Sequence, residues 1–346
     1  MNLTLHRFDL PCRHPFTIAR GTTTVQTTLI VELEQDGASG YGEAVEAPYY
    51  GVTIEEMTTA LERVRSRIEA VTPDNPTGLW EEMRRLLNAD EPDDTPTTMF
   101  PLCALDTAAH DLWGKLHRRP VWRLWGLNLD SNVASDYTIG IDSIDVMVDK
   151  MREFPGWPIY KVKLGTPDDV EIVRELRRHT DAVFRVDANC AWDAEETIRN
   201  ASELRGLNVE FIEQPLPAGD RDGMRQVHRR RELPIIADES CSAEADVDRC
   251  HAEHFDGVNI KLPKCGGLSP ARRMIARARQ LGMKVMVGCF TESSVGISAV
   301  AQLLPLVDYA DLDGALLLER DAATGVTIDR GRVVYPDENG CGVRLL

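Results

Sequence analysis

The chain has 346 residues, a length that favours either two domains or one barrel with an appendage. A hydrophobic content of 43% and a charged content of 27% are ordinary for a water-soluble enzyme. The formal net charge of -17 at pH 7 argues against nucleic acid and anionic membrane surfaces as partners.

The cysteines and the first residues bear on the cellular compartment. Eight cysteines are scattered without a Cys-x-x-Cys pair, a pattern of free thiols in a reducing compartment rather than of a disulfide framework or a zinc site. Residues 1–10 lack the apolar segment of a signal peptide, and no apolar run approaches the length of a membrane span. We therefore expect a cytoplasmic protein, which is free to form a homo-oligomer.

The first 120 residues predict an α+β unit. Residues 3–10 and 27–35 alternate or run apolar as strands do, and a loop over residues 11–24 is predicted between them. These two strands give the unit an antiparallel opening.

Three helices are predicted to follow. Thr53 and Glu56 form a capping box for the first helix, and a second helix begins at about Leu79. Pro101 suits the first position of a third helix, which carries one apolar stripe.

From residue 134 onward, short apolar strands alternate with amphipathic helices. Strands alternating with helices imply parallel βαβ units, and eight of them imply a closed barrel. The last helix is missing from the pattern, and a hairpin within residues 326–335 is predicted to return to the first domain. We therefore predict a first domain at 1–120 with a C-terminal return at 321–346, and a barrel at 121–320. The predicted strands are residues 134–141, 159–165, 182–189, 209–215, 235–240, 257–263, 284–290 and 310–314.

Two lysines interrupt the second barrel strand, which runs Tyr-Lys-Val-Lys-Leu-Gly. Because a strand has period two and rises roughly 3.3 Å per residue, Lys161 and Lys163 share one face and lie about 7 Å apart. Inside a barrel, each ammonium group would disfavour the charge of the other, and the pKa of both would fall toward that of a general base. On its own, such a Lys-x-Lys pattern is commonly a solvated edge strand.

The third, fourth and fifth strands each end in an acid, namely Asp187, Glu213 and Asp238. A parallel barrel gathers the C-terminal ends of its strands at one mouth, so these carboxylates should converge. Their mutual repulsion would be relieved by a hard divalent cation, and all-oxygen ligands favour Mg²⁺. Taken alone, each acid could as well be an N-cap or a surface carboxylate as a metal ligand. Asn189 and Glu239 are predicted to support the ligands or to start helices.

The sixth strand carries a lone lysine, Lys261. The second and sixth of eight strands lie on opposite sides of a barrel, so Lys163 and Lys261 would face a substrate from its two sides. This arrangement suits removal of a weakly acidic proton beside a carboxylate on one side and its return on the other. Lys161 and the metal would hold the oxygens on which charge develops. Lys264, in the next loop, is predicted to be a rim charge.

Taken together, these residues resemble the enolase superfamily, whose members use a Lys or His base with Mg²⁺. The Lys-x-Lys strand with a lone lysine on the sixth strand is similar to the muconate-lactonising subgroup. The resemblance implies a (β/α)7β modified TIM barrel with an α+β N-terminal capping domain. It also implies that the loop over 11–24 and the segment around 48–52 close over the mouth and set specificity.

Within that subgroup, the eighth strand distinguishes dipeptide epimerases from the other enzymes. Asp311-Leu312-Asp313 resembles the Asp-x-Asp motif of dipeptide epimerases, in which the first acid binds the α-ammonium group of the substrate. Muconate-type cycloisomerases and o-succinylbenzoate synthases act on substrates without that cation, and buried acids would be a liability there.

The resemblance therefore implies an isomerase, a Mg²⁺-dependent dipeptide epimerase that inverts the α-carbon of the C-terminal residue of an L,L-dipeptide such as L-Ala-L-Glu or L-Ala-L-Xaa. A cycloisomerase or o-succinylbenzoate synthase, and a catalytically silent binding scaffold, stay open as alternatives. Arg20 resembles the arginine that Ala-Glu epimerases place near the glutamate carboxylate, and it is equally an ordinary loop charge. The implied roles are two bases (Lys163, Lys261), three metal ligands (Asp187, Glu213, Asp238) and four substrate-binding residues (Lys161, Asp311, Asp313, Arg20).

Overall fold

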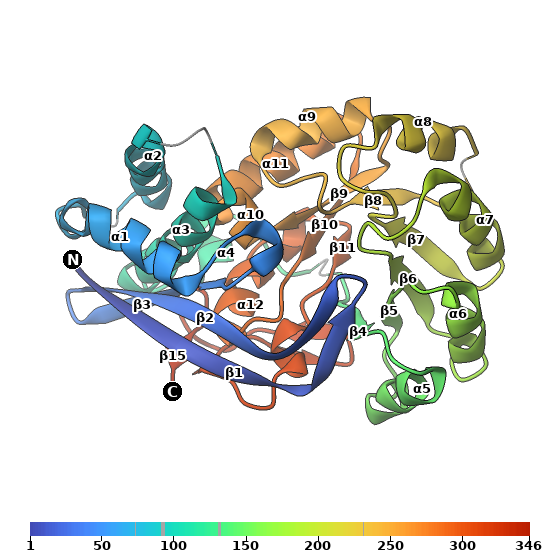
Figure 1. The fold of residues 1–346 in the computed structure, drawn as a ribbon. Coiled ribbons are helices and arrows are strands. Elements are labelled where there is room, and N and C mark those ends of the chain that lie inside the picture. The colour runs from blue at the N-terminus through green and yellow to red at the C-terminus, as the bar shows by residue number, and fades with distance from the viewer. Residues whose placement is uncertain (73, 91–93, 131–132, 231) are drawn as a thin grey trace.

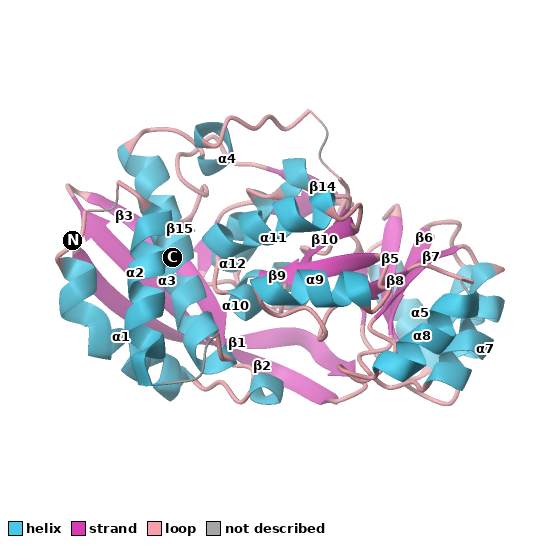
Figure 2. Cartoon of the chain, turned by 90° about the horizontal axis from the view of Figure 1, so that it is seen from above, coloured by secondary structure: helices cyan, strands magenta, loops and turns pink. Residues whose placement is uncertain are grey.

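A computed structural model of the chain describes residues 1–72, 74–90, 94–130, 133–230 and 232–346. The N-terminal strands and helices lie beside a barrel built by the rest of the chain (Figure 1). Both chain ends lie on the side of the N-terminal unit in Figure 1 and again in the view from above in Figure 2. In the described part of the chain, no helix is long and apolar enough to cross a membrane.

The N-terminal sheet has three antiparallel strands, β1 (Asn2–Ile18), β2 (Gly21–Gln35) and β3 (Ala38–Val45). The predicted strands at 3–10 and 27–35 are confirmed, but the predicted loop over 11–24 is wrong. That segment is the outer half of a long β1–β2 hairpin. The pairing slips between Pro11 and Phe16, and this irregularity accommodates the two prolines without ending the strand.

Four helices follow the sheet: α1 (Ile54–Glu69), α2 (Pro76–Leu87), α3 (Pro96–Leu116) and α4 (Val121–Leu124). The predicted capping box is confirmed, because Thr53 Oγ1 accepts from Glu56 N and the Glu56 carboxylate accepts from Thr53 N. The third helix begins at Pro96 rather than at the predicted Pro101, which lies inside it. A proline there removes one helical hydrogen bond, and the burial of most of α3 offsets that loss.

Helix α3 connects the N-terminal unit to the barrel. On one side β3 lies directly on it, since a Cβ atom at Gly40 or Gly42 would overlap the α3 backbone. On the other side, Asp106 accepts hydrogen bonds from Ser269 N at 2.8 Å and Ser269 Oγ at 2.7 Å. The barrel is therefore held at a fixed position against the N-terminal unit.

The barrel sheet contains eight parallel strands in unbroken chain order. They are β4 (Tyr137–Ile139), β5 (Ile159–Lys163), β6 (Val183–Asp187), β7 (Val209–Glu213), β8 (Ile235–Ala237), β9 (Gly257–Lys261), β10 (Lys284–Gly288) and β11 (Tyr309–Ala310). An isolated parallel bridge between Ser135 and Ala310 joins the two ends of the sheet.

A helix follows each of the first seven barrel strands. These helices are α5 (Ile144–Glu153), α6 (Asp169–Arg177), α7 (Ala194–Arg205), α8 (Arg221–Arg230), α9 (Glu244–Ala252), the short α10 (Leu262–Cys265) with α11 (Leu268–Gln280), and α12 (Ser294–Ala301). Strand β11 is followed by the 3-10 helix η4 (Gly314–Leu317). The predicted (β/α)7β barrel with an α+β N-terminal domain is confirmed.

The C-terminal segment forms two small sheets. Strand β12 (Ala323–Thr324) pairs with β15 (Arg344–Leu345), and β13 (Thr327–Asp329) pairs with β14 (Arg332–Val334). The predicted hairpin is thus present, but it packs on the barrel, where Ser135 N donates to Gly331 O at 2.8 Å. The return to the N-terminal unit is made further on, where Asp111 of α3 accepts from Cys341 N at 2.7 Å.

Candidate active site

Three carboxylates meet at the C-terminal mouth of the barrel. Asp187 and Glu213 end β6 and β7, and Asp238 directly follows β8. All three are buried, and one oxygen from each lies within 4.8 Å of the others. The structure therefore brings together the three acids that the strand pattern singled out, and we call them the carboxylate triad.

Lys161 and Lys163 of β5 lie on one side of the triad. Lys163 Nζ lies 2.6 Å from Asp187 Oδ2, and Lys161 Nζ lies 2.7 Å from both Glu213 Oε2 and Asp311 Oδ2. Burial alone would lower the pKa of Lys161, but the charges of Asp311, Glu213 and Asp187 raise it well above its ordinary value. The prediction that the two ammonium groups lower the pKa of both lysines is therefore wrong for Lys161, because carboxylates surround it.

Lys261 reaches the triad from the other side. It ends β9, and its Nζ lies 2.9 Å from Asp238 Oδ2. In the strand order, β5 and β9 flank the three strands that carry the acids. Lys163 contacts the first acid and Lys261 contacts the third, so a substrate seated over the triad would meet one amine at each end.

The prediction of a rim charge for Lys264 is wrong. This lysine is buried in the one-turn helix α10, which directly follows β9. Its Nζ forms an ion pair with Asp238 Oδ1 and donates to the backbone oxygens of Asp238 at 2.6 Å and Cys241 at 2.9 Å. Lys264 therefore holds Asp238 in place through both its side chain and its backbone oxygen.

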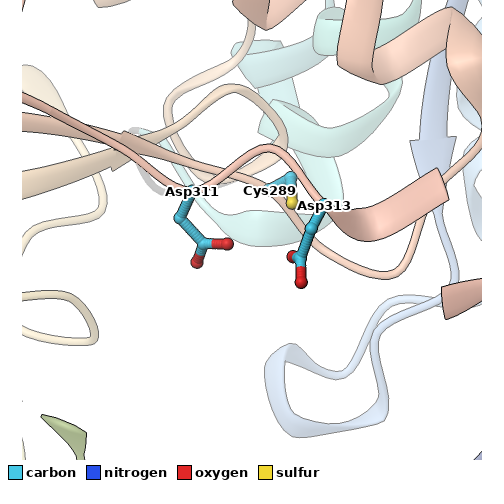
Figure 3. A group of neighbouring side chains, drawn as sticks. All are labelled: Cys289, Asp311 and Asp313. Atoms are coloured by element: carbon cyan, nitrogen blue, oxygen red, sulfur yellow. The ribbon is translucent and has the colours of Figure 1, made fainter. Parts of the chain in front are cut away.

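Asp311 and Asp313 follow β11 rather than lying within a strand. Figure 3 shows both carboxylates on the same side of the backbone, with Cys289 beside Asp313. Thr138 donates to Asp313 through its backbone N and through Oγ1, the latter at 3.2 Å. Burial and the charge of Asp311 raise the pKa of Asp313 to about 8, so Asp311 is the member of this pair that carries the charge at neutral pH.

A cavity of about 150 Å³ lies beside this site. It is lined by both amines that flank the triad, Lys163 and Lys261, and by Asp311. Phe16, Ile18, Phe290 and Leu317 are among the apolar side chains of its wall. The cavity is thus lined by both charged and apolar side chains.

The donor set of the triad fits a hard divalent cation. Burial, with the charges of Asp187 and Asp238, raises the pKa of Glu213 to about 7 despite the nearby Lys161. Carboxylates packed this closely repel one another, and a dication relieves that repulsion. Oxygen ligands with positions left for substrate are the ligands that Mg²⁺ prefers.

Comparison with known families agrees with this geometry. The model of the mandelate racemase and muconate lactonizing enzyme N-terminal domain matches residues 2–126, and the model described as enolase C-terminal domain-like matches residues 146–346. The chain belongs to the enolase superfamily. The predicted membership is confirmed.

Relatives of this enolase-superfamily chain include named dipeptide epimerases. It is 52% identical over 346 residues to the L-Ala-D/L-amino acid epimerase of Flavobacterium johnsoniae, covering 100% of both chains. It is 39% identical to the L-Ala-D/L-Glu epimerase of Bacteroides thetaiotaomicron, covering 99% of this chain and 88% of that one. A dipeptide epimerase from Cytophaga hutchinsonii, solved with Mg and D-Ala-L-Val, matches with a TM-score of 0.90 and 26% identity, covering 100% and 96% of the two chains.

In this superfamily member, Arg20 lies in the turn at the tip of the β1–β2 hairpin. Its Nη1 forms an ion pair with Glu239 at 2.6 Å and donates to Asn189 O at 3.1 Å. Its guanidinium group lies 4.1 Å from the ring centroid of Tyr49, which belongs to the 3-10 helix η1 (Pro48–Tyr50). Arg20 therefore fastens both mouth segments to the barrel, and whether it also contacts a substrate stays a prediction.

Sequence reasoning missed Asn259 in this enolase-superfamily site. Asn259 Nδ2 donates to Glu213 Oε1 at 2.8 Å and so orients one member of the triad. The available signal was alternation, because Asn259 stands two residues before Lys261 on the same face of β9. The backbone N of Asn189 donates to Asp187 Oδ1 at 2.9 Å, and the supporting role of its side chain stays a prediction.

Proposed function

We propose that the chain is a Mg²⁺-dependent dipeptide epimerase, an isomerase that inverts the α-carbon of the C-terminal residue of an L,L-dipeptide. The observation that carries the proposal is the position of Lys163 and Lys261 at opposite ends of a buried carboxylate triad. Two amines at opposite ends are what a one-carbon inversion needs, since one removes a proton and the other returns it. The identity with named epimerases supports the same activity.

The triad of Asp187, Glu213 and Asp238 would hold the Mg²⁺ ion. When bound, the ion would supply electrostatic stabilisation of the charge that develops on the substrate carboxylate. Lys161, with its ammonium group buried beside Glu213, would add a second positive charge at the same place. Lys163 and Lys261 would exchange the α-proton from the two faces of the substrate.

Asp311 would bind the α-ammonium group of the dipeptide. Its Oδ2 accepts a hydrogen bond from Lys161 Nζ at 2.7 Å, whereas its Oδ1 has no hydrogen-bond partner among the described residues. Asp311 also lines the cavity, so this oxygen is the acceptor left for a substrate cation. A cycloisomerase or o-succinylbenzoate synthase would have no use for such an acceptor.

The substrates are proposed to be of the type L-Ala-L-Xaa. The names of the two relatives above both specify L-Ala as the first residue. The cavity of about 150 Å³ that Asp311, Lys163 and Lys261 line is small, which also suits a small first side chain.

The proposal is tested by incubating the enzyme with Mg²⁺ and a panel of L-Ala-L-Xaa dipeptides in D₂O. Proton NMR should show loss of the α-proton signal of the second residue, and chiral analysis should show the L,D product. Asp311→Ala should slow this exchange by at least about tenfold, whereas the surface control Asp329→Ala should retain the original rate. If no dipeptide exchanges its α-proton, the proposed function is refuted. A cytoplasmic location and a homo-oligomeric state stay predictions from the sequence.

A further inference from the structure

The barrel closes through a short seam between β11 and the segment that leads into β4. Elsewhere neighbouring barrel strands form regular ladders of two to five paired positions. At the seam, the pairing among the described residues is the isolated bridge between Ser135 and Ala310, supported by a hydrogen bond of 3.3 Å from Asp136 N to Ala310 O. With so few backbone bonds, side chains have to contribute to holding this seam.

Arg185 crosses the seam from inside the barrel. It projects from β6, and its Nη1 donates to Asp136 Oδ2 at 2.9 Å and to Ala310 O at 3.0 Å. Its Nε donates to Glu210 Oε2 at 2.9 Å. One guanidinium group thus links β6, β7, the entry to β4 and β11.

The chemistry of this contact requires an arginine. Arg185 and Asp136 are both buried, and the Arg185 guanidinium also lies 5.0 Å from the ring centroid of Tyr309. Donors that point in fixed, different directions can bond Glu210 on one side and the Asp136 and Ala310 oxygens on the other. A lysine would offer a single ammonium group, which cannot span these partners.

The seam leads directly into the Asp311-Leu312-Asp313 segment. Ala310, which Arg185 bonds, immediately precedes Asp311. Leu312 N donates to Ser135 Oγ at 2.8 Å, and Asp313 is bonded by Thr138. The backbone that carries both acids is therefore held against the β4 side at successive positions, and Arg185 with Asp136 makes the first of these attachments.

We propose that Arg185 and Asp136 are positioning residues, which set the position of Asp311 for the α-ammonium group of the substrate. The identity of that cation rests on the proposed function, whereas the linkage across the seam does not. If the pair served stability alone, its loss would affect unfolding without changing how the enzyme distinguishes substrates.

The test uses the double variant Arg185→Met with Asp136→Leu, which removes both members of the fully buried pair and leaves only the half-buried Glu210 without its arginine partner. Each enzyme is assayed by α-proton exchange with L-Ala-L-Xaa and with N-propionyl-L-Xaa, which lacks only the amino group. Because a misplacement of about 1 Å costs on the order of 10²-fold, the preference for the dipeptide should fall at least about tenfold in the double variant. The dipeptide preference of Arg185→Lys should lie between those of the original enzyme and the double variant. If the double variant does not fold, Arg185→Lys is used for the same test.

The matched control is Arg177→Met. Arg177 lies 3.9 Å from the ring centroid of Phe184, which also belongs to β6, but its hydrogen bonds go to Leu207 O and Thr180 O, away from the seam. This variant should keep the dipeptide preference of the original enzyme. A folded double variant whose preference stays within about twofold of the original overturns the positioning role.

A second measurement separates this proposal from the proposed function. Amide hydrogen exchange across residues 309–314 should be at least about tenfold faster in the double variant than in Arg177→Met, because the seam attachments are lost. Unchanged protection of that segment overturns the linkage, with or without a substrate. An original enzyme that exchanges no dipeptide α-proton refutes the proposed function instead, and the amide exchange result then still decides whether Arg185 and Asp136 hold the seam.

Discussion

Lys264 provides the sharpest test of how the site is supported, and the perturbation is Lys264→Met. Methionine keeps most of the length of the side chain and removes its ammonium group. In the structure that group forms an ion pair with Asp238 Oδ1 and donates to the backbone oxygens of Asp238 and Cys241 at 2.6 and 2.9 Å. All of these acceptors lie in the interior of the barrel mouth.

The expected loss of stability follows from what the substitution leaves behind. Removal of one partner of a buried ion pair costs about 3–5 kcal/mol, and an unsatisfied buried acceptor costs about 1–3 kcal/mol. Asp238 keeps its second ion pair, with Lys261 at 2.9 Å, which limits the loss. We therefore expect Lys264→Met to lower the free energy of unfolding by about 3–5 kcal/mol.

Urea unfolding in a buffer with EDTA measures this quantity without a contribution from bound metal. Tryptophan fluorescence suits the region, because Trp80 Nε1 donates to Gly266 O at 2.7 Å, next to α10. The matched control is Lys284→Met, since Lys284 is exposed and its ion pair with Asp308 spans 3.2 Å. That control should cost less than about 1 kcal/mol. Equal losses in the two variants would refute the supporting role of Lys264.

Three further predictions concern the reaction. Lys163→Ala and Lys261→Ala should each reduce epimerisation by about 10²- to 10⁴-fold. One variant should still exchange the α-proton of the L,L isomer and the other that of the L,D isomer, because each keeps one base. Deuterium incorporation measures both exchanges, and a variant that loses both contradicts the two-base prediction. Chelation with EDTA should abolish exchange, and Mg²⁺ at 100 times its Kd should stabilise the protein by about 2.7 kcal/mol in thermal unfolding. Asp311→Asn should lower kcat/KM for L-Ala-L-Xaa by about 10- to 100-fold, mainly through a higher KM. Calorimetry should show an unchanged Mg²⁺ affinity in this variant. A lost Mg²⁺ affinity would argue against an ammonium-binding role for Asp311.

The positions of the triad acids could be predicted because they depend on local pattern. Asp187 and Glu213 each follow an apolar run of strand length, and a parallel barrel brings such strand ends to one mouth. The alternation of side chains along a strand predicted that Lys161 and Lys163 both point into the barrel. Strand periodicity determines the direction of a side chain, and that direction was enough to predict that these residues meet.

The errors arose where local pattern competes with tertiary contacts. The segment over 11–24 contains prolines that suggest a loop, yet its pairing with the second strand continues past an irregularity. Pro101 suggests a helix start, yet buried contacts along α3 carry the helix through it. Lys264 follows a strand and therefore suggests a rim, yet the single turn of α10 points it back at Asp238.

The distribution of charge inside the barrel shows why such partners escape prediction. Within the interior, Phe211, Ile236 and Met286 form an apolar cluster from β7, β8 and β10. Arg185 lies against this cluster, 5.3 Å from the ring centroid of Phe211, and its partner Asp136 is 49 residues away in the chain. Alternation predicts that both point inward, but only closure of the barrel at the β11 seam brings them face to face. The backbone that Arg185 bonds at Ala310 continues directly into Asp311, the acid that would bind the substrate cation, so a pairing between residues far apart in the chain bears on the site.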